Sequence, residues 1–207
     1  MTKTDWNPRL RQEFDKPYWT QLQSFVAAER AHSPVYPPKD EVFAALPRLA
    51  TVRGRMQLAA TRANGATVFV DYAHTPDAVE TALKALRPHV MGRLVVVLGA
   101  GGDRDRGKRP LMGAAAAAYA DVVFVTDDNP RTEDPAAIRA EIMAAAPGAI
   151  EIGDRRQAIR EAVSMLKAGD TLVVAGKGHE HGQTIGDQTF HFSDHEEVLA
   201  ALRDRAT

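Results

Sequence analysis

From about residue 67 onward, the chain alternates short β-branched runs with longer segments rich in Ala, Leu and Glu. The runs predict strands over residues 67–71, 94–98, 122–126, 149–152 and 171–175, with a further edge strand over residues 189–192. The longer segments predict helices over residues 75–89, 110–119, 135–145 and 155–167, with a last helix over residues 194–203. Because strands and helices in alternation form βαβ units, we predict an α/β fold with a Rossmann-like, mostly parallel sheet and helices on both faces.

The first 45 or so residues differ from the rest of the chain. An amphipathic stretch over residues 18–30 leads into the proline-rich residues 33–38, and prolines end a helix because they lack the N–H donor. We predict a mainly helical N-terminal arm over residues 1–46 and an α/β domain over residues 47–207. The arm is either a plain extension packed on the domain or a separate segment, and an oligomer formed through it is a further possibility.

The composition narrows the classes of protein that fit. The 207-residue chain has a formal net charge of -1, so no overall field attracts nucleic acid or a membrane surface. It has no cysteine, which removes disulfides, thiolate metal sites and cysteine nucleophiles. No segment has the pattern of a signal peptide or a membrane span. We predict a cytoplasmic protein with no nucleic-acid or membrane partner.

Four residues, Asp128, Asn129, Pro130 and Arg131, follow the apolar run at residues 122–125. In open α/β sheets, ligands bind outside the carboxyl ends of the strands. Arg131 can bind a ligand carboxylate there through two parallel hydrogen bonds. The alternative interpretation is a simple turn that ends a strand, because Asp, Asn and Pro all favour turns.

Two other predicted strands are followed by loops with unusual residues. In residues 71–76, Tyr72 and His74 can stack on a nucleotide, although His74 can equally be a packed or capping residue. Residues 99–110 are rich in glycine and charge, so the backbone can approach a ligand while Arg104, Lys108 and Arg109 supply charge for a carboxylate or phosphate. This loop matches neither the phosphate loop nor the dinucleotide fingerprint, and a solvated basic turn is its alternative interpretation.

A fourth loop, residues 176–180, contains Gly-Lys-Gly, a weak signal for which a solvent-facing Lys177 is the simple interpretation. If the four loops meet at one edge of the sheet, Glu180 lies beside Arg104 and Arg131. A pocket with both signs of charge suits a zwitterion, because an amino acid carries an ammonium and a carboxylate.

Five motifs carry a resemblance to a known family. They are Gly54-Arg55, DYAHTPDA (residues 71–78), GGDRDRGKRPLMG (residues 101–113), TDDNPRTEDP (residues 126–135) and AGKGHE (residues 175–180). Over about residues 50–207, the chain resembles the C-terminal domain of the Mur ligases, and within them the member that adds meso-diaminopimelate to UDP-N-acetylmuramoyl-alanyl-glutamate. The resemblance implies a substrate-binding domain of an ATP-dependent peptidoglycan-precursor ligase.

The resemblance also implies roles for particular residues. Those that bind meso-diaminopimelate are Arg104, Asp128, Asn129, Pro130, Arg131, Gly176 and Glu180. Those that lie near the interdomain hinge and the nucleotide are Arg55, Asp71, Tyr72 and His74. Relatives that add lysine tend to lack the arginine of the DNPR motif, so Arg131 favours diaminopimelate, whose extra carboxylate needs a cation. No catalytic or metal-binding residue is assigned to this chain.

The family's central domain supplies a phosphate loop, magnesium-binding carboxylates and a modified lysine, and the 207 residues contain no such motifs. The resemblance therefore implies ATP and Mg²⁺ as cofactors of the intact family, neither of them bound tightly by this chain. We infer that the chain is not a competent ligase by itself. ATP turnover by the purified chain that depends on diaminopimelate and the UDP-linked dipeptide would contradict this hypothesis.

The arm has a resemblance of its own. Trp6 and residues 16–18, 28–30 and 35–44 resemble the start of a family-1 uracil-DNA glycosylase, but the catalytic Gly-Gln-Asp-Pro-Tyr-His motif is missing from the sequence. A chimera of the two families, natural or engineered and without a function of its own, is therefore one alternative. A dinucleotide-binding oxidoreductase is another, disfavoured by the broken glycine fingerprint after Leu98.

Overall fold

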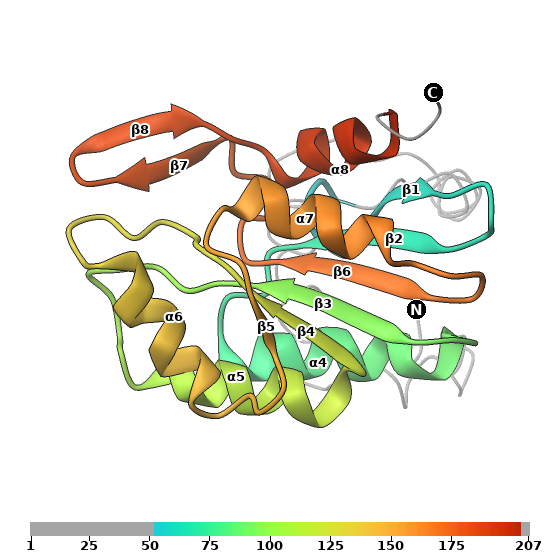
Figure 1. The fold of residues 1–207 in the computed structure, drawn as a ribbon, viewed down its shortest axis with the longest axis horizontal. Coiled ribbons are helices and arrows are strands. Elements are labelled where there is room, and N and C mark those ends of the chain that lie inside the picture. Colours follow the sequence, from blue (N-terminus) through green and yellow to red (C-terminus); the bar gives the residue numbers. More distant parts are fainter. Residues whose placement is uncertain (1–51, 204–207) are drawn as a thin grey trace, which may run out of the picture. The chain divides into compact units, whose positions relative to one another are not determined.

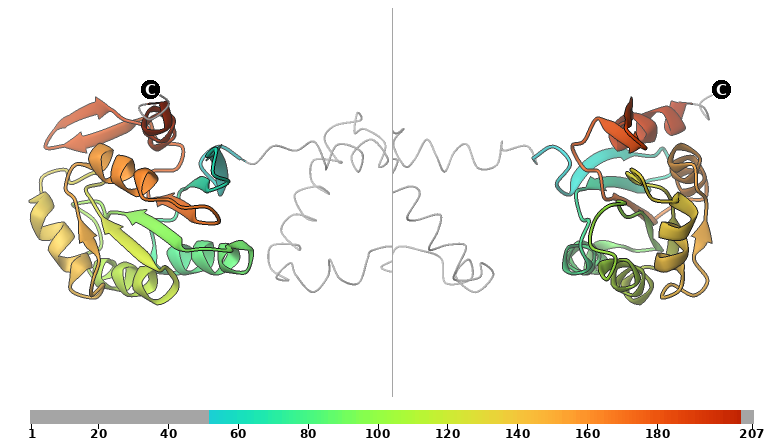
Figure 2. Two further views of the ribbon diagram at one scale, coloured as in Figure 1. Left: turned by 45° about the vertical axis from the view of Figure 1, so that its right-hand side comes forward. Right: turned by 90° about the vertical axis from the view of Figure 1, so that its left-hand side faces the viewer.

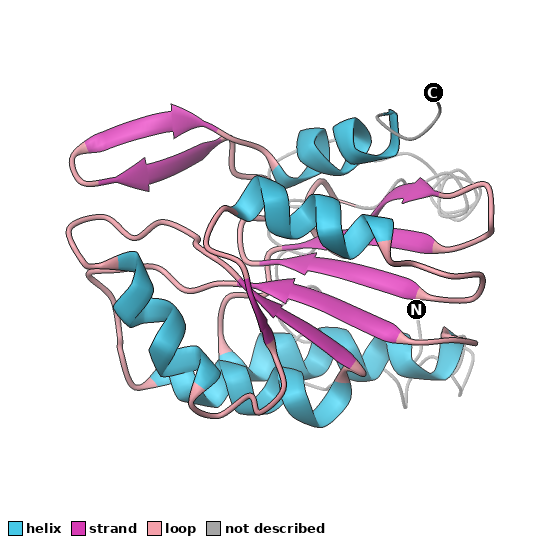
Figure 3. Cartoon of the chain, in the orientation of Figure 1, coloured by secondary structure: helices cyan, strands magenta, loops and turns pink. Residues whose placement is uncertain are grey.

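The computed structural model describes residues 52–203 of the chain. The predicted arm, its glycosylase-like segment and the domain boundary at residue 46 lie outside the described residues. The elements that follow belong to the α/β part of the chain, which is shown as a ribbon in Figure 1 and by secondary structure in Figure 3.

A six-stranded sheet forms the centre of this part. Its strands are β1 (Gln57–Thr61), β2 (Thr67–Asp71), β3 (Leu94–Leu98), β4 (Val122–Val125), β5 (Ile150–Glu151) and β6 (Thr171–Ala175). They lie in the order β1-β2-β6-β3-β4-β5, and only β1 runs antiparallel to its neighbour. The predicted mostly parallel, Rossmann-like sheet is confirmed.

Helices cover both faces of the sheet, as the sequence predicts (Figure 2). They are α4 (Pro76–Leu86), the 3-10 helix η2 (Arg87–His89), α5 (Lys108–Tyr119), α6 (Pro135–Met143), α7 (Arg155–Ser164) and α8 (Asp194–Arg203). Helices α4, α5 and α6 pack on one face, and α7 and α8 on the other. Among residues 52–203, no helix is long and apolar enough to cross a membrane.

The strands β3 and β6 are buried from end to end because each strand contributes side chains to both faces. In β3, Leu94, Val96 and Leu98 pack toward α4 and α5, while Val95 and Val97 pack toward α7. A strand covered on both sides has no polar face, which explains the continuous apolar run in the sequence.

Three helices begin at the residues that sequence rules favour. Thr75 accepts a hydrogen bond from the Ala78 N–H, and Asp134 and Asp154 cap α6 and α7 in the same way. Pro76 occupies the first turn of α4, where a missing N–H costs nothing. These caps fix where each loop from the carboxyl end of a strand must end, and so limit how far the loops can move.

A strand does lie near the predicted residues 189–192, but its predicted place at an edge of the main sheet is wrong. β8 (Gln188–His191) pairs only with β7 (Gly182–Ile185), and the two form a separate antiparallel hairpin. The two-residue connection between them begins with Gly186 at a φ of +61°, a conformation that favours glycine and suits a tight hairpin turn. In Figure 1 the hairpin lies on the side toward which the arrowheads of β3 and β6 point.

Candidate functional site at the carboxyl edge of the sheet

A pocket of about 340 Å³ lies at the carboxyl ends of β2, β3, β4 and β6. All four loops that follow these strands contribute to its wall. The lining residues are Tyr72, His74, Gly99, Ala100, Gly101, Arg104, Lys108, Asp128, Asn129, Arg131, Gly176 and Glu180. The topology therefore brings together the loops that the sequence singles out, at the edge where α/β sheets bind ligands.

Most of the predicted site residues lie in this wall, and three do not. Pro130 is buried behind it, Arg55 lies over the ring of Tyr72, and Asp71 accepts hydrogen bonds from the N–H groups of Met56 and Ala73. Asp71 lines a separate, open depression beside α4. Its carboxylate holds the local backbone, so its contacts in this structure are structural.

Four further residues of the wall, Gly99, Ala100, Gly101 and Lys108, belong to the glycine-rich, charged loop that the sequence singles out, although the family resemblance assigns them no role. Lys108 donates a hydrogen bond to the His74 carbonyl at 3.0 Å and so links the first two loops. It lies in the first turn of α5, beside the glycine-rich run.

Two guanidinium groups and the Lys108 ammonium supply the positive charge of the pocket. Arg131 Nη1 donates to the Gly102 carbonyl at 2.8 Å, and within residues 52–203 its Nη2 and Nε make no hydrogen bond. Arg104 is exposed, and its Nη1 donates to the Asp103 carbonyl at 3.1 Å. Each side chain is anchored by one nitrogen and presents the others, as a carboxylate-binding arginine requires.

The backbone at Arg131 is strained. Its φ is +53°, in the left-handed region that residues other than glycine rarely adopt. The β7–β8 hairpin holds it there, because the Arg131 N–H donates to the Thr184 carbonyl at 3.1 Å and the Gly186 N–H donates to the Arg131 carbonyl at 2.7 Å. Such strain persists only where surrounding contacts maintain it. The hairpin thus determines the direction in which the Arg131 side chain leaves the chain.

Glu180 supplies an acidic group of the wall. Its Oε2 accepts a hydrogen bond from Asn129 Nδ2 at 3.1 Å, and the side chain is one-third exposed. Asp128 is more buried, and its Oδ1 lies 3.5 Å from Lys177 Nζ. The pocket therefore presents a partly exposed carboxylate together with the guanidinium groups of Arg104 and Arg131, the combination that an amino acid requires.

Lys177 is not solvent-facing. Its side chain is fully buried, which contradicts the simple interpretation of Gly-Lys-Gly. No local sequence signal indicates this burial, because it depends on contacts with the hairpin, where the Gly182 carbonyl accepts a hydrogen bond from Lys177 Nζ.

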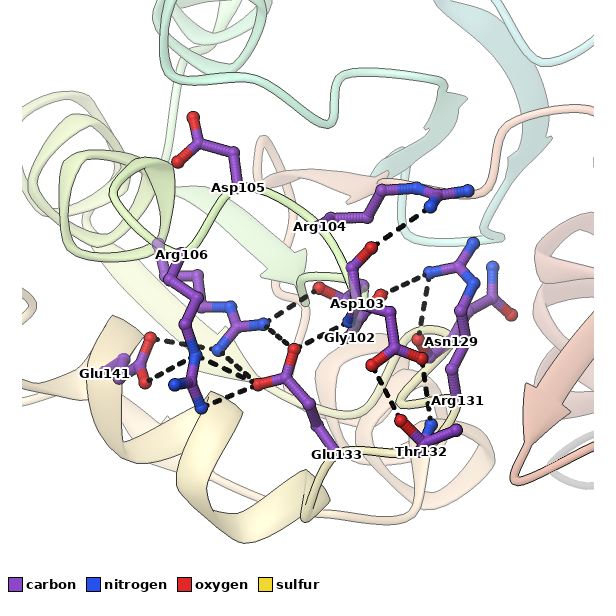
Figure 4. Close-up of polar contacts among 12 residues, drawn as sticks. Gly102, Asp103, Arg104, Asp105, Arg106, Asn129, Arg131, Thr132, Glu133 and Glu141 are labelled. Carbon is purple, nitrogen blue, oxygen red and sulfur yellow. Dashed lines mark hydrogen bonds and ion pairs between the residues drawn. The ribbon is translucent and has the colours of Figure 1, made fainter.

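Outside the pocket, the glycine-rich loop and the segment after Arg131 are joined by side chains (Figure 4). Asp103 accepts hydrogen bonds from the Thr132 hydroxyl at 2.7 Å and the Thr132 N–H at 3.2 Å. Glu133 accepts from the Asp103 N–H at 2.6 Å and from Arg109, which is fully buried. The backbones are also in contact, since a Cβ on Gly102 would lie 1.8 Å from the Pro130 carbonyl oxygen. These contacts fix the spacing between the two pocket arginines.

The Glu133 link leads to a prediction about pH. Hydrogen bonds from Arg109 and the Asp103 N–H lower the pKa of Glu133 from 4.5 to about 2. A depressed pKa in the folded state adds stability above the unfolded-state value, and this is lost as pH falls toward the folded-state value. We expect Glu133→Gln to lower the melting temperature at pH 6, with the difference from the parent shrinking between pH 4.5 and pH 2. Calorimetry across this range checks it.

The control for that experiment is Glu161→Gln, at an exposed position in α7. It should show no comparable pH-dependent difference. A Glu133→Gln difference that stays constant from pH 6 to pH 2 would contradict the assignment of Glu133 as an ion-pair partner.

Aromatic and cationic groups gather around Tyr72 on one side of the pocket. The ring centroid of Tyr72 lies 4.5 Å from that of His74 and 5.0 Å from that of His179, and the Arg55 guanidinium lies 4.5 Å from it. Flat and charged groups in such an arrangement can stack on a nucleotide base or contact its phosphates.

The described residues do not fit ATP and magnesium as a complete site. In residues 52–203, no three His, Cys, Asp or Glu side chains are grouped so that they could hold a metal ion. The glycine-rich loop lacks the order of a phosphate loop, and the Lys108 ammonium already contacts a backbone carbonyl. We therefore derive no chemical step through ATP from these residues.

Fold and pocket together define a Rossmann-like α/β domain of the type that carries a ligand site at the carboxyl edge of its sheet. Residues 54–178 match the family described as "Mur ligase, glutamate ligase domain". The chain belongs to this family, and the part that matches is the family's C-terminal domain.

Curated relatives agree with this assignment. The chain is 66% identical over 169 residues to the UDP-N-acetylmuramoyl-L-alanyl-D-glutamate--2,6-diaminopimelate ligase of Mesorhizobium japonicum, covering 82% of this chain and 35% of the relative. It is 62% identical over 160 residues to the ligase of the same name from Rhizobium meliloti, covering 77% of this chain and 33% of the relative. The chain thus spans about a third of the length of these relatives.

Solved structures give the same result. A structure of UDP-N-acetylmuramoyl-L-alanyl-D-glutamate--2,6-diaminopimelate ligase superposes with a TM-score of 0.71 at 43% identity, over 88% of this chain and 37% of that chain. The folylpolyglutamate synthase/dihydrofolate synthase of Yersinia pestis, solved with AMPPNP and a manganese ion, has a TM-score of 0.58 at 21% identity, over 84% of this chain and 37% of that chain. This second likeness supports the fold alone.

Proposed function

We propose that this chain is the amino-acid-recognising domain of a cytoplasmic, ATP-dependent ligase that adds meso-diaminopimelate to the UDP-linked muramoyl dipeptide during peptidoglycan-precursor synthesis. The observation that carries the proposal is the pocket with both signs of charge, in which Arg104 and Arg131 share a wall with Glu180. The names of the relatives support the same substrate.

The chemistry of the amino acid explains the proposed arrangement. Diaminopimelate has an amino-acid group at each end, so one end can supply the nucleophilic amine while the other is held as a zwitterion. Arg131 and Arg104 would bind the carboxylate of the held end, and Glu180 would accept hydrogen bonds from its ammonium. Asn129 and the backbone at Gly176 would complete the contacts. Pro130 and Asp128 shape the turn that presents Arg131.

The groups around Tyr72 are proposed to contact the nucleotide. Arg55 and His74 lie beside Tyr72, and this side of the pocket is separate from Arg131 in the sequence and in the sheet order. ATP and Mg²⁺ would be held mainly by parts of a Mur ligase that the described residues do not supply.

The experiment compares two amino acids that differ by one carboxylate. The 207-residue chain is titrated with meso-diaminopimelate and, separately, with L-lysine, and binding is followed by calorimetry and by amide chemical shifts. We expect diaminopimelate to bind at least about 10-fold more tightly, since a charge-assisted hydrogen bond contributes about 1.5–3 kcal/mol. Equal affinity for the two amino acids, or shifts that avoid the pocket, would contradict the proposed function.

A further inference from the structure

The side chain of Lys177 lies behind the pocket wall and is not among the residues that line the pocket. Its side chain is fully buried, and its Nζ donates to Asn129 Oδ1 and to the Gly182 carbonyl, both at 2.8 Å. Two carboxylate oxygens lie farther away, Asp128 Oδ1 at 3.5 Å and Glu180 Oε2 at 3.9 Å. A buried ammonium is costly unless it is paired and hydrogen-bonded. The acceptors around Lys177 Nζ compensate for this cost.

The surroundings of Lys177 act on its charge in opposite directions. Burial lowers the pKa of the ammonium, while the carboxylate of Asp128 raises it and Arg155 lowers it, and Asp194 and Glu180 raise it further. The ring of Phe192 lies 5.9 Å from Nζ on the hairpin side. The ammonium is therefore enclosed between the pocket wall and the β7–β8 hairpin.

The contacts of Lys177 fix the orientation of the Asn129 amide. Asn129 Oδ1 accepts a second hydrogen bond from the Thr184 N–H at 2.9 Å, so two donors point at this one oxygen. A flipped amide would set its own N–H groups against both donors. The Nδ2 group must therefore face Glu180, to which it donates at 3.1 Å. Asn129 lines the pocket, and within the described part of the chain its Nδ2 makes one hydrogen bond, the one to Glu180.

We propose that Lys177 is a positioning residue for amino-acid recognition. It acts through Asn129, whose amide it locks, and thereby holds the Glu180 carboxylate where the ligand ammonium is received. The identity of the ligand as diaminopimelate rests on the proposed function. The fixed orientation of the Asn129 amide does not depend on that function, so the ligand and the amide orientation can be tested separately.

The first test needs no ligand. Lys177→Met removes the donors while keeping a side chain of similar length, and Lys167→Met, at an exposed position, is the matched control. Nuclear magnetic resonance follows the side-chain amide of Asn129 in the 207-residue chain. We expect a protected, well-separated pair of amide protons in the parent and in Lys167→Met, and a shifted, exchange-averaged pair in Lys177→Met. An unchanged Asn129 amide in folded Lys177→Met overturns the proposal.

A second variant covers the case in which Lys177→Met does not fold. Lys177→Met combined with Asn129→Leu removes the amide that would be left unpaired, so folding should be recovered if the amide is the group that Lys177 serves. Failure of the double variant to recover a cooperative unfolding transition overturns the proposal as well.

The third test uses the ligand. We expect Lys177→Met to weaken diaminopimelate binding about 10-fold, the equivalent of one hydrogen bond to a charged group. In an Asn129→Ala background the same replacement should have almost no further effect, because the amide through which it acts is gone. Equal losses in both backgrounds would indicate a merely structural role and overturn the proposal. If the parent chain binds no diaminopimelate, the proposed function fails, while the amide measurement still decides the role of Lys177.

Discussion

Replacing Arg131 with alanine is expected to weaken binding of meso-diaminopimelate about 10- to 100-fold, while binding of L-lysine changes much less. The reason is that Arg131 can offer Nη2 and Nε to a ligand, since within residues 52–203 its hydrogen bonds, to the Gly102 and Asn129 carbonyls, are all made by Nη1. Lysine has no second carboxylate for these groups to bind. The measurement is the ratio of the two dissociation constants, which should fall toward one in the variant.

Two companion variants separate the side chain from the backbone at this position. Arg131→Gly also lacks the guanidinium but relieves the positive φ, so we expect it to be about 1 kcal/mol more stable than Arg131→Ala while showing the same loss of selectivity. Arg156→Ala removes an exposed arginine of α7 and should leave both affinities unchanged. A selectivity ratio that survives in Arg131→Ala would exclude Arg131 as the group that recognises the second carboxylate.

The largest effect on stability is expected from Asp194→Ala. Asp194 and Arg155 are both fully buried, and two hydrogen bonds of 2.8 Å join them, from Nε to Oδ1 and from Nη2 to Oδ2. Removing the carboxylate leaves a guanidinium without its counter-charge, which costs about 3–5 kcal/mol. For a domain of this size we expect the melting temperature to fall by about 10 °C, measured by circular dichroism.

The same two helices provide the control. Arg156 and Glu197 form a 2.9 Å ion pair between α7 and α8 in which the Arg156 side chain is about half exposed. Breaking it with Glu197→Ala should cost no more than about 1 kcal/mol. In addition, Arg155→Met with Asp194→Leu should recover much of the lost stability, because no unpaired charge remains. Equal destabilisation by Asp194→Ala and Glu197→Ala would show that burial of the first pair has no energetic consequence.

The strands in the middle of the sheet are the part of the fold that the sequence predicts best. Residues 67–71, 94–98 and 171–175 coincide with β2, β3 and β6. The strands β3 and β6 are buried on both faces, which favours an almost continuous apolar run, and β2 has alternating buried positions filled by Val68 and Val70. The helices α6 and α7 are shorter than predicted. The residues beyond their ends, Ala144-Ala145 and Met165-Leu166-Lys167, are all good helix formers, and local composition alone does not show where tertiary packing stops a helix.

The elements that were missed are those with weak strand propensity. β1 reads Gln-Leu-Ala-Ala-Thr, and β7 begins with a glycine, so neither resembles a strand by composition. The sequence signals that indicate these strands lie in the turns that connect them to their neighbouring strands. Asn64-Gly65 precedes β2, and Gly186-Asp187 joins β7 to β8, both of them sequences that favour tight hairpin turns.

For the site, the sequence predicts the loops better than the contacts within them. Parallel strands necessarily bring their carboxyl-end loops to one edge, so the shared pocket of Arg104, Asn129 and Glu180 follows from the topology. The burial of Lys177 does not follow, because it depends on a hairpin folding back over the loop. The roles of the pocket residues in binding diaminopimelate remain our proposal.

The two edge strands of the six-stranded sheet, β1 and β5, affect whether the protein aggregates at high concentration. On one side, β1 is irregular between Leu58 and Ala60, which interrupts the row of backbone groups that a foreign strand would need. On the other, β5 is two residues long, and its Glu151 is held by Arg139 at 2.8 Å. Within the described residues, neither edge strand of this sheet offers a long, flat template on which another chain could pair. Fibrillar aggregation by strand addition at this sheet is therefore disfavoured by the fold itself.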